Sequence, residues 1–150
     1  MENLVFLCLG TTKISGDSIG PKVGDRLKEM NIGAYVYGDT RRQVTSINVE
    51  DYVAMLKKRH SGDRIIAVDS ALGKSADIGK IKITDAGVKP GGAFNKTRER
   101  VGDMGILAVV GDSEKDRLDQ LRNSSSELVD ELVEKVVGYA LTYADDMRFL

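Results

Sequence analysis

The sequence has little cysteine, histidine and proline, and its 150 residues include no tryptophan. Its single cysteine, Cys8, cannot form an internal disulfide, and the apolar residues around it predict a buried, unreactive thiol. The only histidine, His60, ends the basic run Lys57-Lys58-Arg59-His60, which predicts the solvated last turn of a helix. These shortages exclude a disulfide scaffold and leave little material for catalysis that depends on histidine.

An excess of charge of one sign and long apolar runs are also missing. The 22 basic and 23 acidic residues are mixed along the chain, which excludes an electrostatic footprint for nucleic acid or an anionic membrane. No apolar run approaches the roughly 18 residues that span a bilayer, and residues 1–3 lack the basic start of a signal peptide. We therefore expect a cytoplasmic protein that binds neither nucleic acid nor membrane.

Buried strands alternate with amphipathic helices along the chain. Hydrophobic residues make up 41% of the sequence, and a chain of this length can bury roughly 70% of its surface. This alternation predicts one α/β domain over residues 1–150, with three α/β/α layers and a mostly parallel sheet flanked by helices. The expected strands are 4–9, 34–37, 64–68, 80–84 and 106–110, and the expected helices are 18–30, 49–59 and 129–144.

The segment SGDSIGP, residues 15–21, places Asp17 and Ser18 between glycines shortly after the first apolar run. A phosphate-binding loop needs the pattern G-x-x-x-x-G-K-[ST], which is absent here, and Asp17 would repel a phosphate. The Gly16-Asp17-Ser18 block resembles that of a lipase and esterase family, whose serine needs a histidine base, and His60 is poorly placed to be one. Asp17 as a helix cap remains an alternative.

A second aspartate follows the buried run of IIAVDSALGK. Asp69 comes at the predicted end of this strand and is followed by small residues. Ligands of open α/β sheets bind outside the carboxyl ends of the strands, so Asp17 and Asp69 are expected to face one crevice. Two such carboxylates either share a proton and activate water or chelate a metal ion.

Four segments, in this order and spacing, resemble the YyaC sporulation protein family: LGTTKISGDSIGPKVGDRL, VYGD, IIAVDSALGK and KPGGAFNKTRERVGDMGI. The resemblance covers roughly residues 4–143. That family is similar to the spore germination protease and to the hydrogenase maturation endopeptidases, which share a phosphorylase/hydrolase-like α/β fold. The resemblance therefore implies a peptidase linked to sporulation that acts on a protein or peptide.

The resemblance implies roles for the two acids. Asp17 and Asp69 match the proposed catalytic pair of the germination protease, and the corresponding acids of the hydrogenase endopeptidases hold a metal ion. Those endopeptidases add a histidine ligand, which His60 is poorly placed to supply, and Thr12 stands where many relatives carry an aspartate. A divalent metal is thus an open alternative that the sequence does not require.

The remaining candidates surround this pair. The glycine-rich stretch 85–103 is expected to be a functional or mobile loop. The residues expected to bind substrate or to orient the acids are Ser18, Thr12, Ser70, Pro90, Gly91, Asn95 and Lys96. The alternative to a peptidase is a catalytically inactive relative that binds a protein partner or small ligand in the same crevice, and a homo-oligomer remains open.

Overall fold

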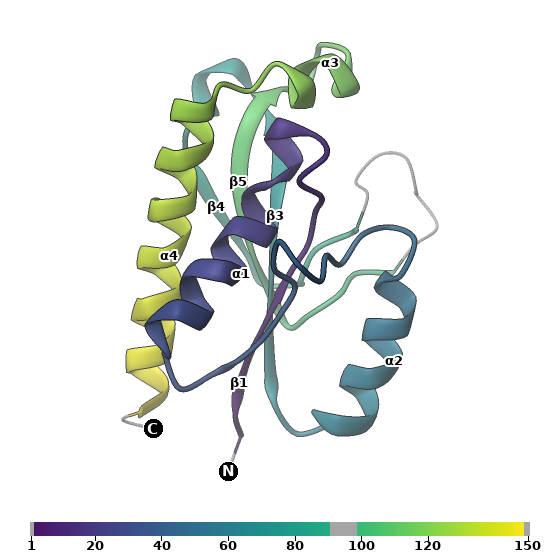
Figure 1. The fold of residues 1–150 in the computed structure, drawn as a ribbon, viewed down its shortest axis with the longest axis vertical. Coiled ribbons are helices and arrows are strands. Elements are labelled where there is room, and N and C mark those ends of the chain that lie inside the picture. The colour runs from purple at the N-terminus through teal and green to yellow at the C-terminus, as the bar shows by residue number, and fades with distance from the viewer. Residues whose placement is uncertain (1, 91–98, 149–150) are drawn as a thin grey trace.

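A five-stranded sheet forms the centre of the protein. The computed structural model describes residues 2–90 and 99–148 (Figure 1). The strands lie in the order β2-β1-β3-β5-β4 and are parallel, except that β4 runs antiparallel to β5. Their bounds are β1 (Leu4–Cys8), β2 (Tyr35–Tyr37), β3 (Arg64–Gly73), β4 (Ile81–Thr84) and β5 (Met104–Asp112). The predicted α/β class with a mostly parallel sheet is confirmed.

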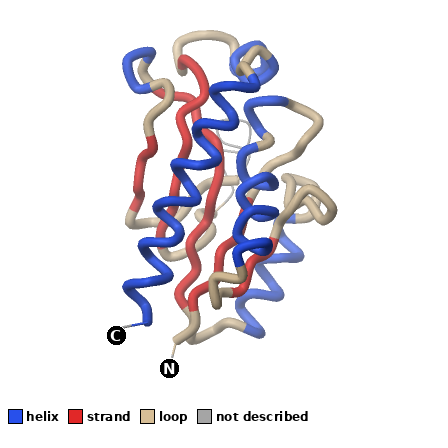
Figure 2. The backbone as a smooth tube through the Cα atoms, turned by 60° about the vertical axis from the view of Figure 1, so that its left-hand side comes forward, coloured by secondary structure: helices blue, strands red, loops and turns tan. Residues whose placement is uncertain are grey.

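Helices cover both faces of the sheet. α1 and α4 lie side by side on one face, and α2 lies on the other (Figures 1 and 2). The helices are α1 (Ile19–Met30), α2 (Val49–Arg59), α3 (Arg117–Arg122) and α4 (Ser126–Arg148), with short 3-10 turns η1 (Ser15–Asp17) and η2 (Ser75–Asp77). Within the described ranges, none of the helices is long and apolar enough to cross a membrane.

The core follows the alternation of side chains along the strands. Phe6 and Ile66 belong to the apolar cluster beneath α1 and α4, whereas Val5 and Ala67 belong to the cluster beneath α2. All four side chains are fully buried. The central strands are thus covered on both faces, which explains why they are continuous apolar runs in the sequence.

The third strand is longer than predicted. The sequence predicted an end at residue 68, but β3 continues to Gly73 because it pairs with β5 as far as Asp112. β1 stops much earlier, since its last residue, Cys8, pairs with Val68. Asp69 therefore lies inside β3, at the point where β1 no longer covers the edge of that strand.

Several turns and helix ends also differ from the prediction. The sequence offers Asn48 as the N-cap of the helix that starts at Val49. Asn48 does take the position before α2, but its side chain accepts from the Thr45 N–H (2.8 Å) instead of capping the helix. Ser125 Oγ accepts from the Leu128 N–H (3.1 Å) at the start of α4. In the sequence, Ser124-Ser125-Ser126-Glu127 offers a capping box for this helix, and α4 does begin at Ser126. The short helix α3 was not predicted.

Candidate active site

The loop after β1 positions Asp17. Gly10 has φ +138°, and a side chain there would collide with the Asp17 carbonyl group. The Thr11 N–H donates to the same carbonyl oxygen (2.9 Å). Asp17 is the last residue of η1, whereas the position before α1 belongs to Ser18, whose side chain does not cap the helix. The interpretation of Asp17 as a helix cap is therefore wrong.

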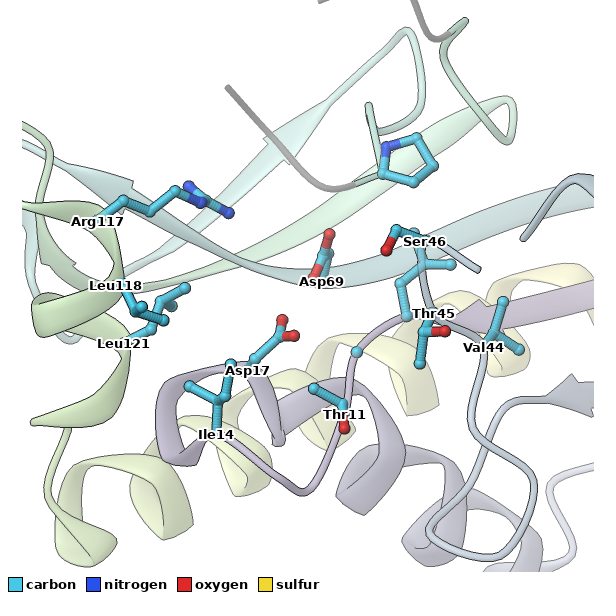
Figure 3. A pocket seen from close by; sticks show the side chains of 13 residues that line it. Thr11, Ile14, Asp17, Val44, Thr45, Ser46, Asp69, Arg117, Leu118 and Leu121 are labelled. Carbon is cyan, nitrogen blue, oxygen red and sulfur yellow. The ribbon is translucent and has the colours of Figure 1, made fainter. Parts of the chain in front are cut away.

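Asp17 and Asp69 face one cavity of about 480 Å³ at the carboxyl end of β1 (Figure 3). Asp17 reaches it from the α1 side, and Asp69 reaches it from β3 beyond the end of β1. Asp69 is only 8% exposed. The cavity is completed by the loop before α2 and by α3, through residues that include Val44, Thr45, Ser46, Leu118 and Leu121.

Burial holds both carboxyl groups toward their uncharged forms. It raises the pKa of Asp17 to about 6, an effect that the nearby positive charge of Arg117 opposes. Burial and then the neighbouring Asp17 charge raise the pKa of Asp69 well above its ordinary range. Two close carboxyl groups titrate as a coupled pair, so the loss of a proton from one acid makes the loss of a proton from the other less favourable.

Arg117 is a site residue that the sequence analysis missed. It is the first residue of α3, it is half-buried, and its guanidinium group points toward the two acids (Figure 3). A signal for this helix did exist, because Asp116 precedes it and accepts from the Asp119 N–H (3.0 Å) as a helix cap does. The side chain's direction into the site depends on the fold and has no sequence signal.

A second cavity of about 500 Å³ adjoins the first, and its lining residues Val88 and Leu107 belong to the apolar cluster beneath α2 or pack against it. Asp69 and Arg117 line both cavities. Its floor is formed by apolar side chains that include Leu72, Val88 and Leu107. A ligand that extends from one cavity into the other would therefore pass the carboxyl pair.

The fold separates the two predicted serines. Ser70 is 7% exposed, and its Oγ lies 3.5 Å from Asp17 Oδ1, to which it donates. The Ser70 N–H donates to Asp69 Oδ1 (2.8 Å), so this residue contacts both acids. Ser18, in contrast, is buried and donates to the Ser15 carbonyl oxygen (2.6 Å), which gives it a structural role.

The other candidates are distributed around the first cavity and beyond it. Pro90 lines the cavity, as predicted. Thr12 is exposed and exchanges hydrogen bonds with Gln43 rather than with the acids. Gly91, Asn95 and Lys96 lie outside the described residues.

A resident transition-metal ion does not fit the described donors. Such sites use three or more His, Cys, Asp or Glu ligands, and the described residues contain no cluster of that size. Asp17 and Asp69 stand as two acids beside the positive charge of Arg117, which disfavours a cation. Proton transfer by the carboxyl pair is a chemistry that these described residues supply by themselves.

His60 is far from this site, as the sequence analysis expected, but it is not solvated. It is 5% exposed at the amino ends of the strands. Its Nε2 lies 2.7 Å from the Tyr37 hydroxyl group, and its Nδ1 lies 2.7 Å from Asp63 Oδ2. The side chain that was predicted to be solvated is therefore part of a buried polar cluster.

Solved structures with a similar fold include several proteases. The hydrogenase maturation protease HycI from Thermococcus kodakarensis KOD1 matches with a TM-score of 0.62 and 19% identity, over 95% of this chain and 92% of that one. HybD from Thermococcus kodakarensis matches with a TM-score of 0.59 and 20% identity, over 96% and 99%. At these identities the likeness establishes the fold.

The sequence comparisons establish the family. The uncharacterized protein YyaC of Bacillus subtilis strain 168 is 37% identical over 108 residues, which are 71% of this chain and 53% of YyaC. The chain thus spans about half the length of that curated relative. A family model described as "Protein of unknown function (DUF1256)" matches residues 1–138. The resemblance to YyaC is confirmed, and the chain belongs to the DUF1256 family.

Proposed function

We propose that this protein is a peptidase in which Asp17 and Asp69 hydrolyse a peptide bond as a proton-sharing pair. One observation carries the proposal: two acids from separate segments face one cavity, and their pKa values are both raised. Groups with perturbed pKa values in a cleft are typical of catalytic sites, because acid–base catalysis requires a pKa near the working pH.

The different environments of the two acids suggest their roles. Asp17, whose pKa is raised to about 6, is mostly ionised at neutral pH and serves as the general base. Asp69 is more deeply buried and lies beside the charge of Asp17, so it keeps the proton and serves as the general acid. Ser70 contacts both acids and orients them.

The reaction then proceeds through a tetrahedral intermediate. Asp17 takes a proton from water while the water oxygen bonds to the peptide carbonyl carbon, and Asp69 gives its proton to the carbonyl oxygen. When the C–N bond breaks, Asp17 protonates the leaving amine and Asp69 regains a proton from a hydroxyl group of the intermediate. Each acid returns to its starting state, so no co-reactant besides water is needed.

The comparisons support this proposal at the level of the fold and the family. The structural neighbours HycI and HybD are maturation proteases by name, and we extend a protein or peptide substrate to this chain. We include in the proposal a cytoplasmic location, as the sequence predicts, and a role in sporulation, as the family resemblance implies. A second copy of the chain as a partner remains a separate hypothesis.

The experiment is a cleavage assay on small spore proteins and a denatured control protein. The wild type is compared with Asp17→Asn and Asp69→Asn, with and without a chelator, and products are identified by mass spectrometry. We expect cleavage by the wild type that the chelator does not abolish. Its kcat/KM should rise with pH through about 6, where Asp17 loses its proton, and fall where Asp69 loses its own.

Two outcomes would contradict the proposal. Loss of cleavage with chelator would assign the chemistry to a metal ion. If a folded wild type cleaves none of the substrates yet binds one of them, the protein is an inactive relative that uses the crevice for a partner.

A further inference from the structure

The second cavity differs in charge from the rest of the molecule. Among the residues that the structure describes, it is lined by four basic side chains and by one acid, Asp69, although the whole chain has a net charge of −1. The four basic residues are Lys89, Arg100, Lys115 and Arg117. Basic side chains therefore outnumber acidic ones around this cavity, whereas the two kinds are nearly balanced in the whole chain.

Three separate segments contribute these cations. Lys89 follows Val88 and Arg100 precedes Val101, so both lie on the same side of the antiparallel bridge between Val88 and Val101, whereas Lys115 follows β5. All three side chains are exposed, so their charges are available to a ligand. The Arg100 side chain is positioned by one hydrogen bond, because its Nη1 donates to the Gly87 carbonyl oxygen (3.2 Å).

Elsewhere in the protein, several lysines form ion pairs with acidic side chains. Lys28, Lys80 and Lys82 are each paired with an aspartate within 3.4 Å. Among the ion pairs within residues 2–90 and 99–148, none includes the lysines or Arg100 of the second cavity. Within the described residues, the two lysines and Arg100 therefore keep their charge free of a neighbouring carboxylate.

The floor of the cavity identifies the kind of anion that fits. Leu72, Val88 and Leu107 offer an apolar surface, and no aromatic side chain is among the described residues that line it. Proteins that bind single-stranded nucleic acid stack its bases on aromatic rings, and the described part of this lining offers none. An apolar floor with a basic rim suits a peptide that carries carboxylate side chains.

The position of the cavity connects it to the site of the proposed reaction. Asp69 and Arg117 stand in the wall between the two cavities, and the first cavity holds Asp17. A peptide that crosses this wall would present one bond to the carboxyl pair and its next residues to the basic rim.

We propose that the second cavity is a specificity subsite for an acidic segment of the protein substrate, recognised by Lys89, Arg100, Lys115 and Arg117. This inference rests on the proposed peptidase function for the identity of the ligand as a substrate. It adds that cleavage favours peptides with glutamate or aspartate side chains on one side of the bond that is broken.

The test measures the binding of short fluorescent peptides with capped ends by anisotropy. One peptide is rich in glutamate, and a second carries glutamine at the same positions. The protein carries Asp17→Asn, which blocks the proposed chemistry at a residue that does not line the second cavity. We expect the glutamate peptide to bind at least about tenfold more tightly than the glutamine peptide, with less difference at high salt.

Variants of the rim locate the effect. Lys89→Gln, Arg100→Gln and Lys115→Gln should each weaken binding of the glutamate peptide about two- to fivefold, the range of an exposed charge contact. The matched control is Lys58→Gln, because Lys58 is an exposed residue in the last turn of α2, at the opposite end of the sheet. Thermal unfolding of each variant checks that the fold is kept.

Several results would overturn the assignment. The first two are equal binding of the glutamate and glutamine peptides, and a loss of binding in Lys58→Gln as large as in the rim variants. The other two are tighter binding of an oligonucleotide than of the glutamate peptide, and tight binding of the glutamine peptide when its C-terminal carboxylate is left uncapped. Cleavage by the wild type keeps the two proposals distinct. Cleavage without a preference for acidic peptides would refute the subsite proposal alone. Charge-dependent binding without any cleavage would refute the peptidase proposal and leave a binding site for acidic peptides.

Discussion

Aspartates at the amino ends of the strands accept hydrogen bonds from the backbone, whereas those at the carboxyl ends face a cavity. Asp63 accepts from the Asn3 N–H (2.9 Å) and contacts His60, and Asp103 accepts from the Ile65 N–H (2.7 Å). The carboxyl groups of Asp17 and Asp69 face the first cavity, where the Ser70 hydroxyl group donates to Asp17 and the Ser70 N–H donates to Asp69.

The pKa shifts of these acids follow the same division. The Asn3 N–H and then His60 lower the pKa of Asp63, whereas burial raises the pKa of Asp17 and of Asp69. A carboxylate that stabilises a fold is held in its charged form, and a carboxyl group that transfers protons must reach both forms. The comparison therefore separates structural from candidate catalytic aspartates without reference to any relative.

The largest expected effect is on catalysis. On the substrate found by the cleavage assay, Asp69→Asn should lower kcat/KM about 10²- to 10⁴-fold, because the amide cannot donate the proton of an acid. Asp63→Asn, at the other end of the sheet, should keep kcat/KM within about threefold. Comparable losses in the two variants would mean that the division between the ends of the sheet does not reflect function.

The next effect is on stability as a function of pH. The pKa of Asp17 rises from 3.8 to about 6 on folding, so its contribution is fully present below about pH 4 and is lost as the pH rises through 6. Asp17→Asn removes that loss. Relative to the wild type, its free energy of unfolding should increase between about pH 4 and 7, by up to about 3 kcal/mol at roughly 1.4 kcal/mol per pKa unit. Urea unfolding at several pH values measures this, and parallel curves would refute it.

Replacement of His60 should lower the stability of the protein and leave its activity unchanged, which is the reverse of the expectation for the two acids of the site. His60→Ala removes the partner of the Tyr37 hydroxyl group and one of the two contacts of the Asp63 carboxylate, and it removes ring contacts with Tyr35. We expect a loss of about 2 kcal/mol in the free energy of unfolding. Cleavage by the folded protein should stay within about threefold of the wild type, and a larger loss of activity at full folding would connect this cluster to the site.

Much of this division was visible in the sequence, and the reason is local. Asp17 and Asp69 follow apolar runs, and the rule that ligands bind at the carboxyl ends of strands was enough to place both at one crevice. The full length of β3 was not visible, because it depends on pairing with β5. Burial of His60 also depends on distant residues, since Tyr35 and Tyr37 of β2 cover it.

The smallest expected effect separates the two serines near Asp17. Ser70 Oγ donates to Asp17 over a long 3.5 Å, which lowers the pKa of that carboxyl group against the effect of burial. Ser70→Ala should raise the pKa of Asp17 slightly and so lower kcat/KM about twofold below pH 6, with little change at pH 8.

Ser18→Ala is the matched control for this measurement. It removes a hydrogen bond to the Ser15 carbonyl oxygen in a buried turn and should cost about 1 kcal/mol in the free energy of unfolding. Because the Ser18 hydroxyl group does not contact either acid, the shape of the pH profile should stay that of the wild type. A profile that shifts in Ser18→Ala but not in Ser70→Ala would mean that the turn, rather than the strand, sets the protonation of Asp17.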